Sequence, residues 1–371
     1  MLLDLQNHSL CTEYDQFVEQ SPYGNLLQSR AWARVKTNWD AAFLYLRRSG
    51  VIVASLSLLS IYDQKVGQRF FYVPRGPVVN PEDRESLREI LQEALCYARE
   101  HDGFLLRVEP NLLDTKENRE LSKSLGLPLE RHRAFCSQPP LSSILDLGGR
   151  SMDEIFDDYS KNTRRNIRSA YRHGLELYIG GRKDLPTFYQ LIQDMSRMKG
   201  LGHRPYSYFE SIYEALGERV SLYFSLLPSE LRNQAIAYGE RPAIQPIYER
   251  SDHQVLAGSL AVRYGDTLYS LYGADPVYHC LGQSYLLDYE ELRLCHRLGC
   301  RYYDMGGLFS ADPNDKLTSF KLRFTQQGLY RWLSVWEFTL NHRAYETWCG
   351  YQKHEKQLRS LLRRQRASSE D

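Results

Sequence analysis

The stretch GQSYLLDYEELRLCHRLGCRYYDMGG (residues 282–307) has the pattern of a helix that ends at a glycine and is followed by a strand. An earlier stretch, PEDRESLREILQEALCYAREHDGFLLRVEP (residues 81–110), repeats that order of features. Gly299 and Gly103 each stand where a left-handed C-cap residue is expected. Two copies of one helix–strand unit, about 200 residues apart, predict duplicated domains.

The rest of the chain alternates between strand-like and helical patterns, which predicts a mixed fold, α/β or α+β. The length of 371 residues suggests about two domains. The turn-rich stretch QPPLSSILDLGGR (138–150) places their boundary, giving domains at 1–147 and 148–332. The predicted strands are 43–48, 51–61, 70–74, 104–109, 220–227, 255–265, 267–273 and 301–305. The predicted helices are 82–100, 151–173, 184–199, 206–216 and 284–298.

Composition excludes several classes of protein. The net charge of +1 rules out bulk attraction to polyanions, so any nucleic-acid contact must come from a local patch. Seven cysteines with no C-x-x-C pair argue against a disulfide framework or a zinc site. We see no signal-peptide pattern and no apolar run long enough to cross a bilayer, so we expect a cytoplasmic protein.

The segment KNTRRNIRSAYRHGL (161–175) is basic and contains no acidic residue. On a helix its five cations would share one face and repel one another unless an anion lies nearby. The stripe is therefore either a solvated helix face or a surface for phosphate or nucleic acid. Its members are Lys161, Arg164, Arg165, Arg168 and Arg172.

Three further segments carry candidate binding residues. QSRAWARVKTNW (28–39) places Lys36 at the edge of an apolar helical face, where it points to solvent or to a cleft. GLGHRPYSYF (200–209) puts Arg204 in a turn that suits a bidentate phosphate contact or a carbonyl cap.

The third segment, YYDMGGLFSADPNDKLTSFKLRF (302–324), breaks a strand at Gly306 and Gly307 and restarts as a helix. Glycines allow a ligand to approach the backbone closely. In the helix, the spacing predicts burial of Leu317, Phe320 and Phe324. Lys321 would lie beside them, where its aimed charge could stabilise an oxyanion.

The sequence lacks the G-x-S-x-G, Walker, Rossmann and H-E-x-x-H motifs. CLGQS (280–284) opens a helix whose N–H groups could bind an anion, as a faint version of an acyl-coenzyme A pyrophosphate loop.

Taken together, these segments resemble the FemABX family of peptidyltransferases. The resemblance covers about residues 20–340. It rests on these pieces in this order: QSRAWARVKTNW, YVPRGPVV (72–79), LRVEP (106–110), KNTRRNIRSAYRHGLEL (161–177), RPYSYF (204–209), LYSLYGA (268–274), YDMGGLF (303–309) and SFKLRF (319–324).

The resemblance implies two tandem domains of the acetyltransferase (GNAT) type, with a C-terminal segment of about 333–371 that returns to the first. It implies an enzyme that transfers an amino acid from aminoacyl-tRNA to an amine of a peptidoglycan precursor, either UDP-MurNAc-peptide or lipid II, with no further cofactor or metal. The loop at 228–254 is too short for the coiled-coil arm of the longest members. Contact with the inner face of the membrane is also implied for a lipid-linked acceptor.

Residue by residue, Lys36 and Arg204 match the positions that hold the precursor's diphosphate, one from each predicted domain. Tyr208 and Tyr272 match cleft tyrosines that line the acceptor. Lys321, beside Phe320, matches the lysine placed near the aminoacyl ester.

Glu109 stands where the family commonly has Asp before Pro, and it could aid deprotonation of the amine. A cleft tyrosine five residues before that acid is replaced by Phe104. The basic stripe, and more weakly the tail at 353–366, would contact tRNA or an anionic membrane. The alternatives are an acyl-coenzyme A N-acyltransferase, a tRNA-dependent transferase with a small-molecule acceptor, and a non-catalytic binding module. The sequence does not reveal which amino acid is transferred.

Overall fold

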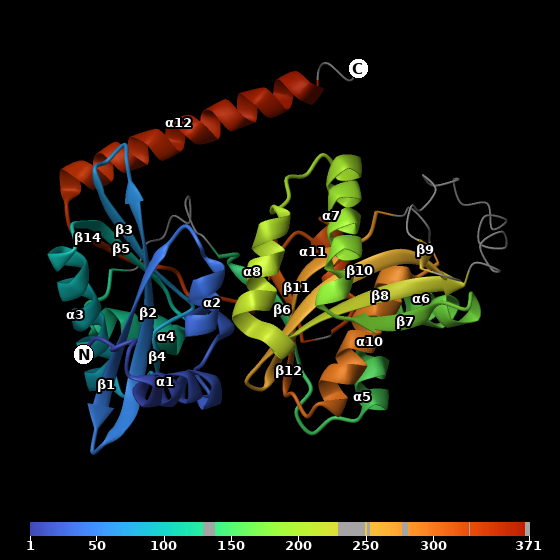
Figure 1. Cartoon of the computed structure of the whole chain (residues 1–371), viewed down its shortest axis with the longest axis horizontal. Coiled ribbons are helices and arrows are strands. Elements are labelled where there is room, and N and C mark those ends of the chain that lie inside the picture. The colour runs from blue at the N-terminus through green and yellow to red at the C-terminus, as the bar shows by residue number, and fades with distance from the viewer. Residues whose placement is uncertain (129–137, 229–248, 251–252, 277–280, 326, 368–371) are drawn as a thin grey trace. The chain divides into compact units, whose positions relative to one another are not determined.

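The computed structural model describes residues 1–128, 138–228, 249–250, 253–276, 281–325 and 327–367, without the side chains of 249, 250, 253 and 355–367. The chain divides into two compact units, which Figure 1 shows with their elements labelled. Unit 1 comprises Met1–Gln138 and Trp332–Asp371, and unit 2 comprises Pro139–Arg331.

Unit 1 is built on a six-stranded sheet of order β1-β2-β3-β5-β14, with β4 paired to β2. Only the β3–β5 pair is parallel among these pairs, and helix α3 connects its two strands. The strands are β1 (Asp40–Arg48), β2 (Val51–Asp63), β3 (Gln68–Pro74), β4 (Val78–Val79), β5 (Gly103–Glu109) and β14 (Trp336–Thr339). The helices are α1 (His8–Gln20), η1 (Leu26–Gln28), α2 (Arg30–Val35), α3 (Arg84–Glu100), α4 (Lys116–Ser124) and α12 (His342–Ala367).

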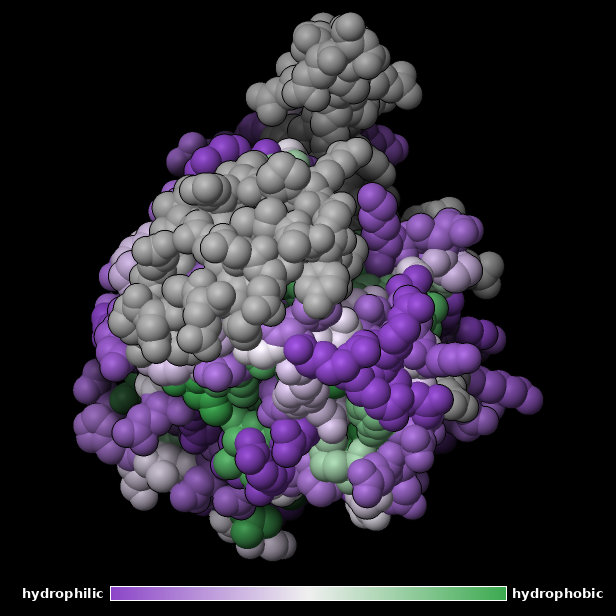
Figure 2. All heavy atoms as spheres, turned by 90° about the vertical axis from the view of Figure 1, so that its right-hand side faces the viewer, coloured by the Kyte–Doolittle hydropathy of each residue, from purple (hydrophilic) through white to green (hydrophobic). Residues whose placement is uncertain are grey.

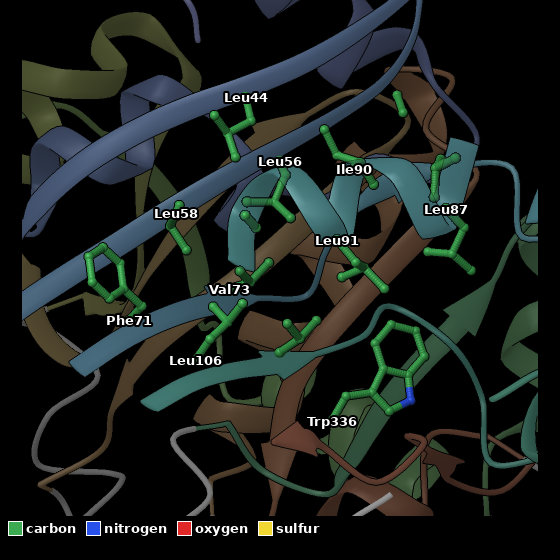
Figure 3. Close-up of a cluster of buried hydrophobic side chains, with 14 of the residues drawn as sticks. Leu44, Leu56, Leu58, Phe71, Val73, Leu87, Ile90, Leu91, Leu106 and Trp336 are labelled. Atoms are coloured by element: carbon green, nitrogen blue, oxygen red, sulfur yellow. The ribbon is translucent and has the colours of Figure 1, made fainter. Parts of the chain in front are cut away.

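The core of unit 1 lies between α3 and the sheet (Figure 3). Helix α3 begins at the N-cap Asp83, whose carboxylate accepts the Ser86 N–H, and buries Leu87, Ile90 and Leu91. Trp336 arrives from the far end of the sequence and is fully buried, and its indole N–H donates to Ser122 Oγ at 3.2 Å. The C-terminal segment therefore supplies both a strand and a core residue to the unit.

Unit 2 has an eight-stranded sheet of order β13-β6-β12-β11-β10-β8-β7, with β9 paired to β10. Its parallel pair, β11–β12, is connected by α10. The strands are β6 (Leu141–Asp146), β7 (Glu176–Gly180), β8 (Val220–Pro228), β9 (Glu249–Arg250), β10 (His253–Tyr264), β11 (Thr267–Ala274), β12 (Tyr302–Leu308) and β13 (Tyr330–Arg331). The helices are α5 (Met152–Asp158), α6 (Lys161–Arg172), η2 (Arg182–Asp184), α7 (Leu185–Lys199), α8 (Tyr206–Leu216), η3 (Gly217–Arg219), α10 (Gln283–Arg297) and α11 (Lys316–Leu322).

Figure 1 shows α7 and α8 on one side of this sheet and α5, α6 and α10 on the other. Both units thus contain a strand–helix–strand crossover inside an otherwise mainly antiparallel sheet, which is a tandem GNAT-like arrangement. The mixed fold and the internal repeat predicted from the sequence are confirmed.

Four details differ from the sequence-based expectations. Gly103 is not a left-handed cap: Asp102 adopts the positive φ of 55°, whereas a Cβ on Gly103 would come within 2.5 Å of the Ala98 carbonyl. Gly299 does adopt a positive φ, of 70°. The predicted helix 151–173 is two helices, because Ser160 caps α6 by accepting the Thr163 N–H.

The last two differences concern the boundary between the domains and the buried face of α11. Strand β6 falls inside the predicted domain 1–147 but pairs with β12, so the compact units change at Gln138/Pro139. In α11, Leu317 is 52% exposed, while Thr318 and Lys321 are buried. Polar bonds set this rotation: Thr318 donates to the Ser310 carbonyl at 3.0 Å, and Lys321 faces the carbonyl of Gly307.

Candidate active site

Lys36 lies at the C-terminal end of α2 and borders a hollow in unit 1. The Ser29 hydroxyl starts this short helix by accepting the Trp32 N–H. The Lys36 ammonium lies 5.1 Å from the centroid of the Trp32 ring. The hollow has a volume of about 490 Å³ and is also bordered by Arg34 and Trp39. A half-buried lysine beside an aromatic wall is suited to holding an anionic group.

Arg204, Tyr208 and Tyr272 come together in unit 2, as the sequence predicts for residues of one site. The Tyr272 hydroxyl donates to the Tyr208 hydroxyl at 3.0 Å, and the Arg204 guanidinium lies 5.3 Å from the Tyr208 ring. Burial and the neighbouring Tyr272 raise the pKa of Tyr208, so it stays a neutral phenol. Arg204 and Tyr272 border a hollow of about 450 Å³ together with His203.

His203 was not singled out by sequence reasoning, although it lies within GLGHRPYSYF. Its Nδ1 is 2.9 Å from the Ser196 hydroxyl, and its ring packs edge-on against Tyr189. The signal that could have identified His203 in the sequence is its position directly before Arg204. The joint use of Lys36 of unit 1 and Arg204 of unit 2 on one diphosphate remains a prediction.

Glu109 ends β5 and is 3% exposed. Its carboxylate accepts the Tyr72 hydroxyl at 2.7 Å and the Gln138 N–H at 3.0 Å. Burial, together with the charge of Glu109, holds the pKa of Tyr72 well above its usual range. These contacts favour a role in fixing the end of the strand, and the role as a base remains a prediction. Phe104 is fully buried against Phe70 and Trp348.

Gly306 and Gly307 lie near the end of β12, and each is a glycine for a different reason. Gly306 has a φ of 88°, a conformation that favours glycine. A Cβ on Gly307 would come within 2.3 Å of the Pro139 ring, so this glycine makes room for a proline. The structure therefore gives both glycines a structural reason, while the close approach of a substrate here remains a prediction.

Lys321 is 8% exposed, and its ammonium donates to the Gly307 carbonyl at 3.4 Å. Burial lowers the pKa of Lys321, and the negative charges of Asp304 and Asp288 offset part of that lowering. Half-buried Phe320 packs on Tyr285 and Phe324 with ring centroids 5.0 and 5.2 Å away. A cation held at a strand end is suited to stabilising negative charge on an ester carbonyl.

Sequence reasoning missed an acidic cluster on α10, in which the charge of Asp288 acts on Lys321. Asp288 and Glu291 lie on α10, and the hydroxyl of Tyr303 on β12 lies between them. Burial raises the pKa of Asp288 to about 6 and that of Glu291 to about 8. The only signal was the acidic DYEEL (288–292) between leucines, which is also the pattern of a solvated helix edge.

The basic stripe forms α6, but only four of its five cations share one hollow. These four are Lys161, Arg165, Arg168 and Arg172, beside Tyr171. Arg164 instead pairs with Asp157 at 3.1 Å. Figure 2 looks onto this side of unit 2, and hydrophilic side chains cover much of its described surface.

The N-terminus of α10, where the sequence suggested a faint pyrophosphate loop, is occupied by the protein itself. Gln283 Nε2 donates to the Asp275 carboxylate at 3.2 Å, and the Ser284 hydroxyl donates to it too. A Cβ on Gly282 would lie 2.3 Å from the Asn166 carbonyl, so α6 closes the approach. An acidic side chain at this position disfavours a phosphate.

Three further observations concern segments that the sequence analysis named outside these clusters. Cys280 lies outside the described residues, as does most of the 228–254 loop. The tail at 353–366 lies in α12, but its side chains from 355 onward are outside the description. No helix in the described part of the chain combines the length and hydropathy needed to cross a membrane.

Comparisons with known proteins identify relatives of this chain by sequence and by fold. A sequence profile described as the FemAB family matches residues 11–241. The UDP-N-acetylmuramoylpentapeptide-lysine N(6)-alanyltransferase of Weissella viridescens is 25% identical over 354 residues, covering 93% of this chain and 98% of the relative. A lipid II:glycine glycyltransferase of Staphylococcus aureus is 30% identical over 222 residues, covering 57% of this chain and 52% of the relative.

Among solved structures, FemX superposes with a TM-score of 0.77 at 22% identity, covering 91% of this chain and 97% of FemX. The C-terminal domain of a putative lysylphosphatidylglycerol synthetase from Agrobacterium fabrum gives a TM-score of 0.52 at 12% identity, covering 91% and 94%. These likenesses concern the fold.

Proposed function

Because the chain belongs to the FemAB family, we propose that it transfers an amino acid to an amino group of a peptidoglycan precursor and forms an amide. The observation that carries the proposal is the match to the alanyltransferase, which runs through 93% of this chain and 98% of that enzyme. The buried, aimed ammonium of Lys321 supplies the chemistry that such a reaction needs. The donor in this proposal is aminoacyl-tRNA.

The reaction is acyl transfer from an ester to an amine. The amine nitrogen bonds to the ester carbonyl carbon, the bond from that carbon to the ribose oxygen breaks, and the proton lost by the amine balances the one gained by that oxygen. The ester is already activated, so alignment and oxyanion stabilisation are the main tasks of the protein. Lys321 would offset the negative charge that develops on the carbonyl oxygen or that of the terminal phosphate.

The acceptor would be held through its diphosphate, by Lys36 in unit 1 and by Arg204 in unit 2. Arginine suits a diphosphate because its guanidinium can make two parallel hydrogen bonds. Tyr208 and Tyr272, joined by their hydroxyl groups, would line the acceptor. Glu109 would keep the end of β5 in place through its hydrogen bond with Tyr72. A comparison of the transfer rates of Y72F and E109Q tests whether Glu109 also helps to deprotonate the amine.

The α6 surface, defined as Lys161, Arg165, Arg168 and Arg172, would bind the acceptor arm of the tRNA. Four cations at one hollow attract phosphates through a salt-sensitive interaction. A lipid-linked acceptor would bring an anionic membrane to the protein, and binding to phosphatidylglycerol vesicles tests that possibility separately.

An acyl-coenzyme A N-acyltransferase shares the fold but needs a free helix N-terminus for its pyrophosphate. Asp275 accepts hydrogen bonds from Gln283 and Ser284 at that position in α10. This occupancy argues against acyl-coenzyme A as the donor.

The test is an in vitro assay with mixed charged tRNAs and a lysine-containing precursor, read as a mass increase of one amino-acid residue. UDP-linked precursor, lipid II and a free stem peptide form three parallel arms. We expect a product with one of the first two and only with charged tRNA. Turnover with acetyl-coenzyme A and no tRNA would overturn the proposal, as would transfer to the free peptide at the same rate.

A further inference from the structure

The loop between α7 and α8 holds the ring of His203 in a defined position next to Arg204 (Figure 1). Helix α7 ends at the C-cap Gly200, and the Ser196 carbonyl accepts the Leu201 N–H at 3.0 Å, so the loop folds back onto the last turn of the helix. Ser196 is 7% exposed, and its hydroxyl contacts both the Leu201 carbonyl and Nδ1 of His203. One buried side chain therefore holds both the loop and the imidazole ring.

The hydrogens of this small network fix the tautomer of His203. The Ser196 hydroxyl has one hydrogen, and because a carbonyl oxygen can only accept, that hydrogen goes to the Leu201 carbonyl. The 2.9 Å contact between the Ser196 oxygen and His203 Nδ1 then needs a hydrogen on Nδ1. A neutral imidazole with its hydrogen on Nδ1 has a lone pair on Nε2. In the neutral ring, Nε2 of His203 is therefore a hydrogen-bond acceptor.

Aromatic packing holds the ring from a second side. Tyr189 of α7 packs edge-on against the His203 ring, with the centroids 5.8 Å apart. Tyr189 in turn packs against Tyr206 and Phe209 of α8, at 5.2 and 6.0 Å. A ring that is fixed by a hydrogen bond at one nitrogen and by packing at its edge presents its other nitrogen at a defined place.

This second nitrogen belongs to a residue of the hollow in which the proposed function places the acceptor. His203 is exposed and borders the hollow of about 450 Å³ that Arg204 and Tyr272 also border. The Arg204 guanidinium has only donors, which suits the oxygens of a phosphate. The Tyr272 hydroxyl spends its hydrogen on Tyr208. Nε2 of His203 adds an acceptor next to the arginine, which suits a hydroxyl group next to the phosphate.

We propose that Nε2 of His203 accepts a hydrogen bond from a hydroxyl of the sugar that is joined to the diphosphate of the acceptor. This inference rests on the proposed function for the diphosphate at Arg204. The sugar is either the ribose of a UDP-linked precursor or the amino sugar that UDP-linked and lipid-linked precursors share. His203 thus selects acceptors that carry a sugar at this position, and Ser196 is a positioning residue that keeps Nε2 unprotonated.

Two amide substitutions separate the roles of the two ring nitrogens. The amide in H203Q reaches about as far from the backbone as Nε2, and its oxygen can accept the bond from the sugar. The amide in H203N ends near the place of Nδ1, so it can still donate to Ser196 but leaves no polar atom at the place of Nε2. Because His203 is exposed, both variants should melt near the wild-type temperature.

The first measurement is the binding of a UDP-linked precursor and of a short-chain lipid-linked precursor to the full-length protein by calorimetry, without tRNA. H203N should weaken binding about tenfold, the effect of one lost hydrogen bond, while H203Q should stay within about threefold of the wild type. Weaker binding of both precursors identifies the amino sugar, and weaker binding of the UDP-linked precursor alone identifies the ribose. The reverse order, with H203Q impaired and H203N normal, would show that His203 only ties the loop to Ser196 and would overturn the proposal.

Inorganic pyrophosphate is the probe that lacks the sugar. Its binding should be equal in the wild type and in H203N, and an equal loss with pyrophosphate and with precursor would overturn the proposal, because His203 would then act on the diphosphate. H173N is the matched control, since Nδ1 of His173 also bonds to a serine of the preceding helix, 2.8 Å from the Ser169 carbonyl. It should leave precursor binding unchanged.

Transfer kinetics add a second readout. In H203N the KM for the acceptor should rise about tenfold, with kcat within about twofold of the wild type, because the lost contact is to a part of the acceptor that does not react. A fall in kcat at unchanged KM would contradict this assignment. If the wild-type protein binds precursor but transfers no amino acid from charged tRNA, the proposed function fails, while the binding comparison still decides the role of His203.

Discussion

The two strand–helix–strand crossovers, β3–α3–β5 and β11–α10–β12, share a topology but not a buried surface. Helix α3 buries only small or apolar side chains: Ser86, Leu87, Ile90, Leu91, Ala94 and Ala98. Helix α10 buries two carboxyl groups, Glu290 and Glu291, beside its leucines. Burying an acid disfavours its charged form and lowers stability unless partners compensate. The same crossover topology thus has an apolar buried surface in unit 1 and a buried polar cluster in unit 2.

The strand ends show the same contrast. At the end of β5, Glu109 is engaged by Tyr72 and by the Gln138 N–H. Near the end of β12, Gly306 adopts a positive φ, and the Lys321 ammonium from α11 donates to the Gly307 carbonyl. Residues that depart from the usual sequence–structure preferences, such as buried charged groups, are found most often at functional sites. Four predictions test whether unit 2 is the chemical half.

Replacing Lys321 by alanine should have the largest effect. Loss of one oxyanion-stabilising cation lowers kcat by about 100- to 1,000-fold, while the melting temperature should hold, because the change also removes a buried charge. Initial rates in the tRNA assay and a thermal melt measure the two quantities. The control is K316A, since Lys316 is exposed at the start of the same helix. Equal losses in both variants would refute the assignment.

Ile90→Ala in α3 should damage stability and spare chemistry. Ile90 is fully buried, and a cavity of this kind costs about 2–5 kcal/mol. Urea denaturation reports the loss of unfolding free energy, and the specific activity of the folded fraction should stay near that of the wild type. A large fall in kcat without loss of stability would reverse the comparison between the units.

E291Q should stabilise the protein at alkaline pH. The pKa of Glu291 is raised in the folded state, so folding binds a proton that the unfolded chain releases, and stability falls as pH rises from about 4 to about 8. The glutamine removes this loss. Above pH 8 the gain should exceed about 1 kcal/mol, since one unit of pKa shift corresponds to about 1.4 kcal/mol. Near pH 4 the two proteins should unfold alike, and a constant offset at all pH values would contradict the shift.

The smallest effect concerns the α6 surface. R165A should weaken tRNA binding and reduce the slope of log affinity against log salt by about one, because one phosphate contact is lost. R164A is the matched control, since Arg164 pairs with Asp157 instead of facing the hollow. Filter binding at several salt concentrations compares them. Identical slopes for the two variants would remove α6 from the tRNA surface.

Sequence periodicity was enough to predict most elements of the fold, because burial patterns and caps are local. Helix 206–216 and the glycine cap at 299 are examples. The prediction that Gly103 is a left-handed helix cap was wrong. A glycine is needed there because the backbone passes close to the Ala98 carbonyl. The burial of Leu317 was predicted wrongly because Thr318 donates to the Ser310 carbonyl in the loop and Lys321 donates to the Gly307 carbonyl in β12.

The candidate site was predictable only where residues stand in motifs. Lys36, Arg204 and Lys321 could be named from their neighbours in sequence. The Glu291 cluster could not, because charged residues on a helix are usually exposed. Its burial depends on Ser259 and Tyr303, which come from strands elsewhere in the sequence.

The late arrival of β14 has a consequence for biosynthesis. Residues 139–331 are translated between β5 and the strand that covers its edge, so the first unit waits for its last strand while the second emerges from the ribosome. At about 5–20 residues per second, the wait lasts roughly 10–40 s. During that time the β5 edge and the site of Trp336 stay open to solvent or to a chaperone, and the half that is made first is the half that is completed last.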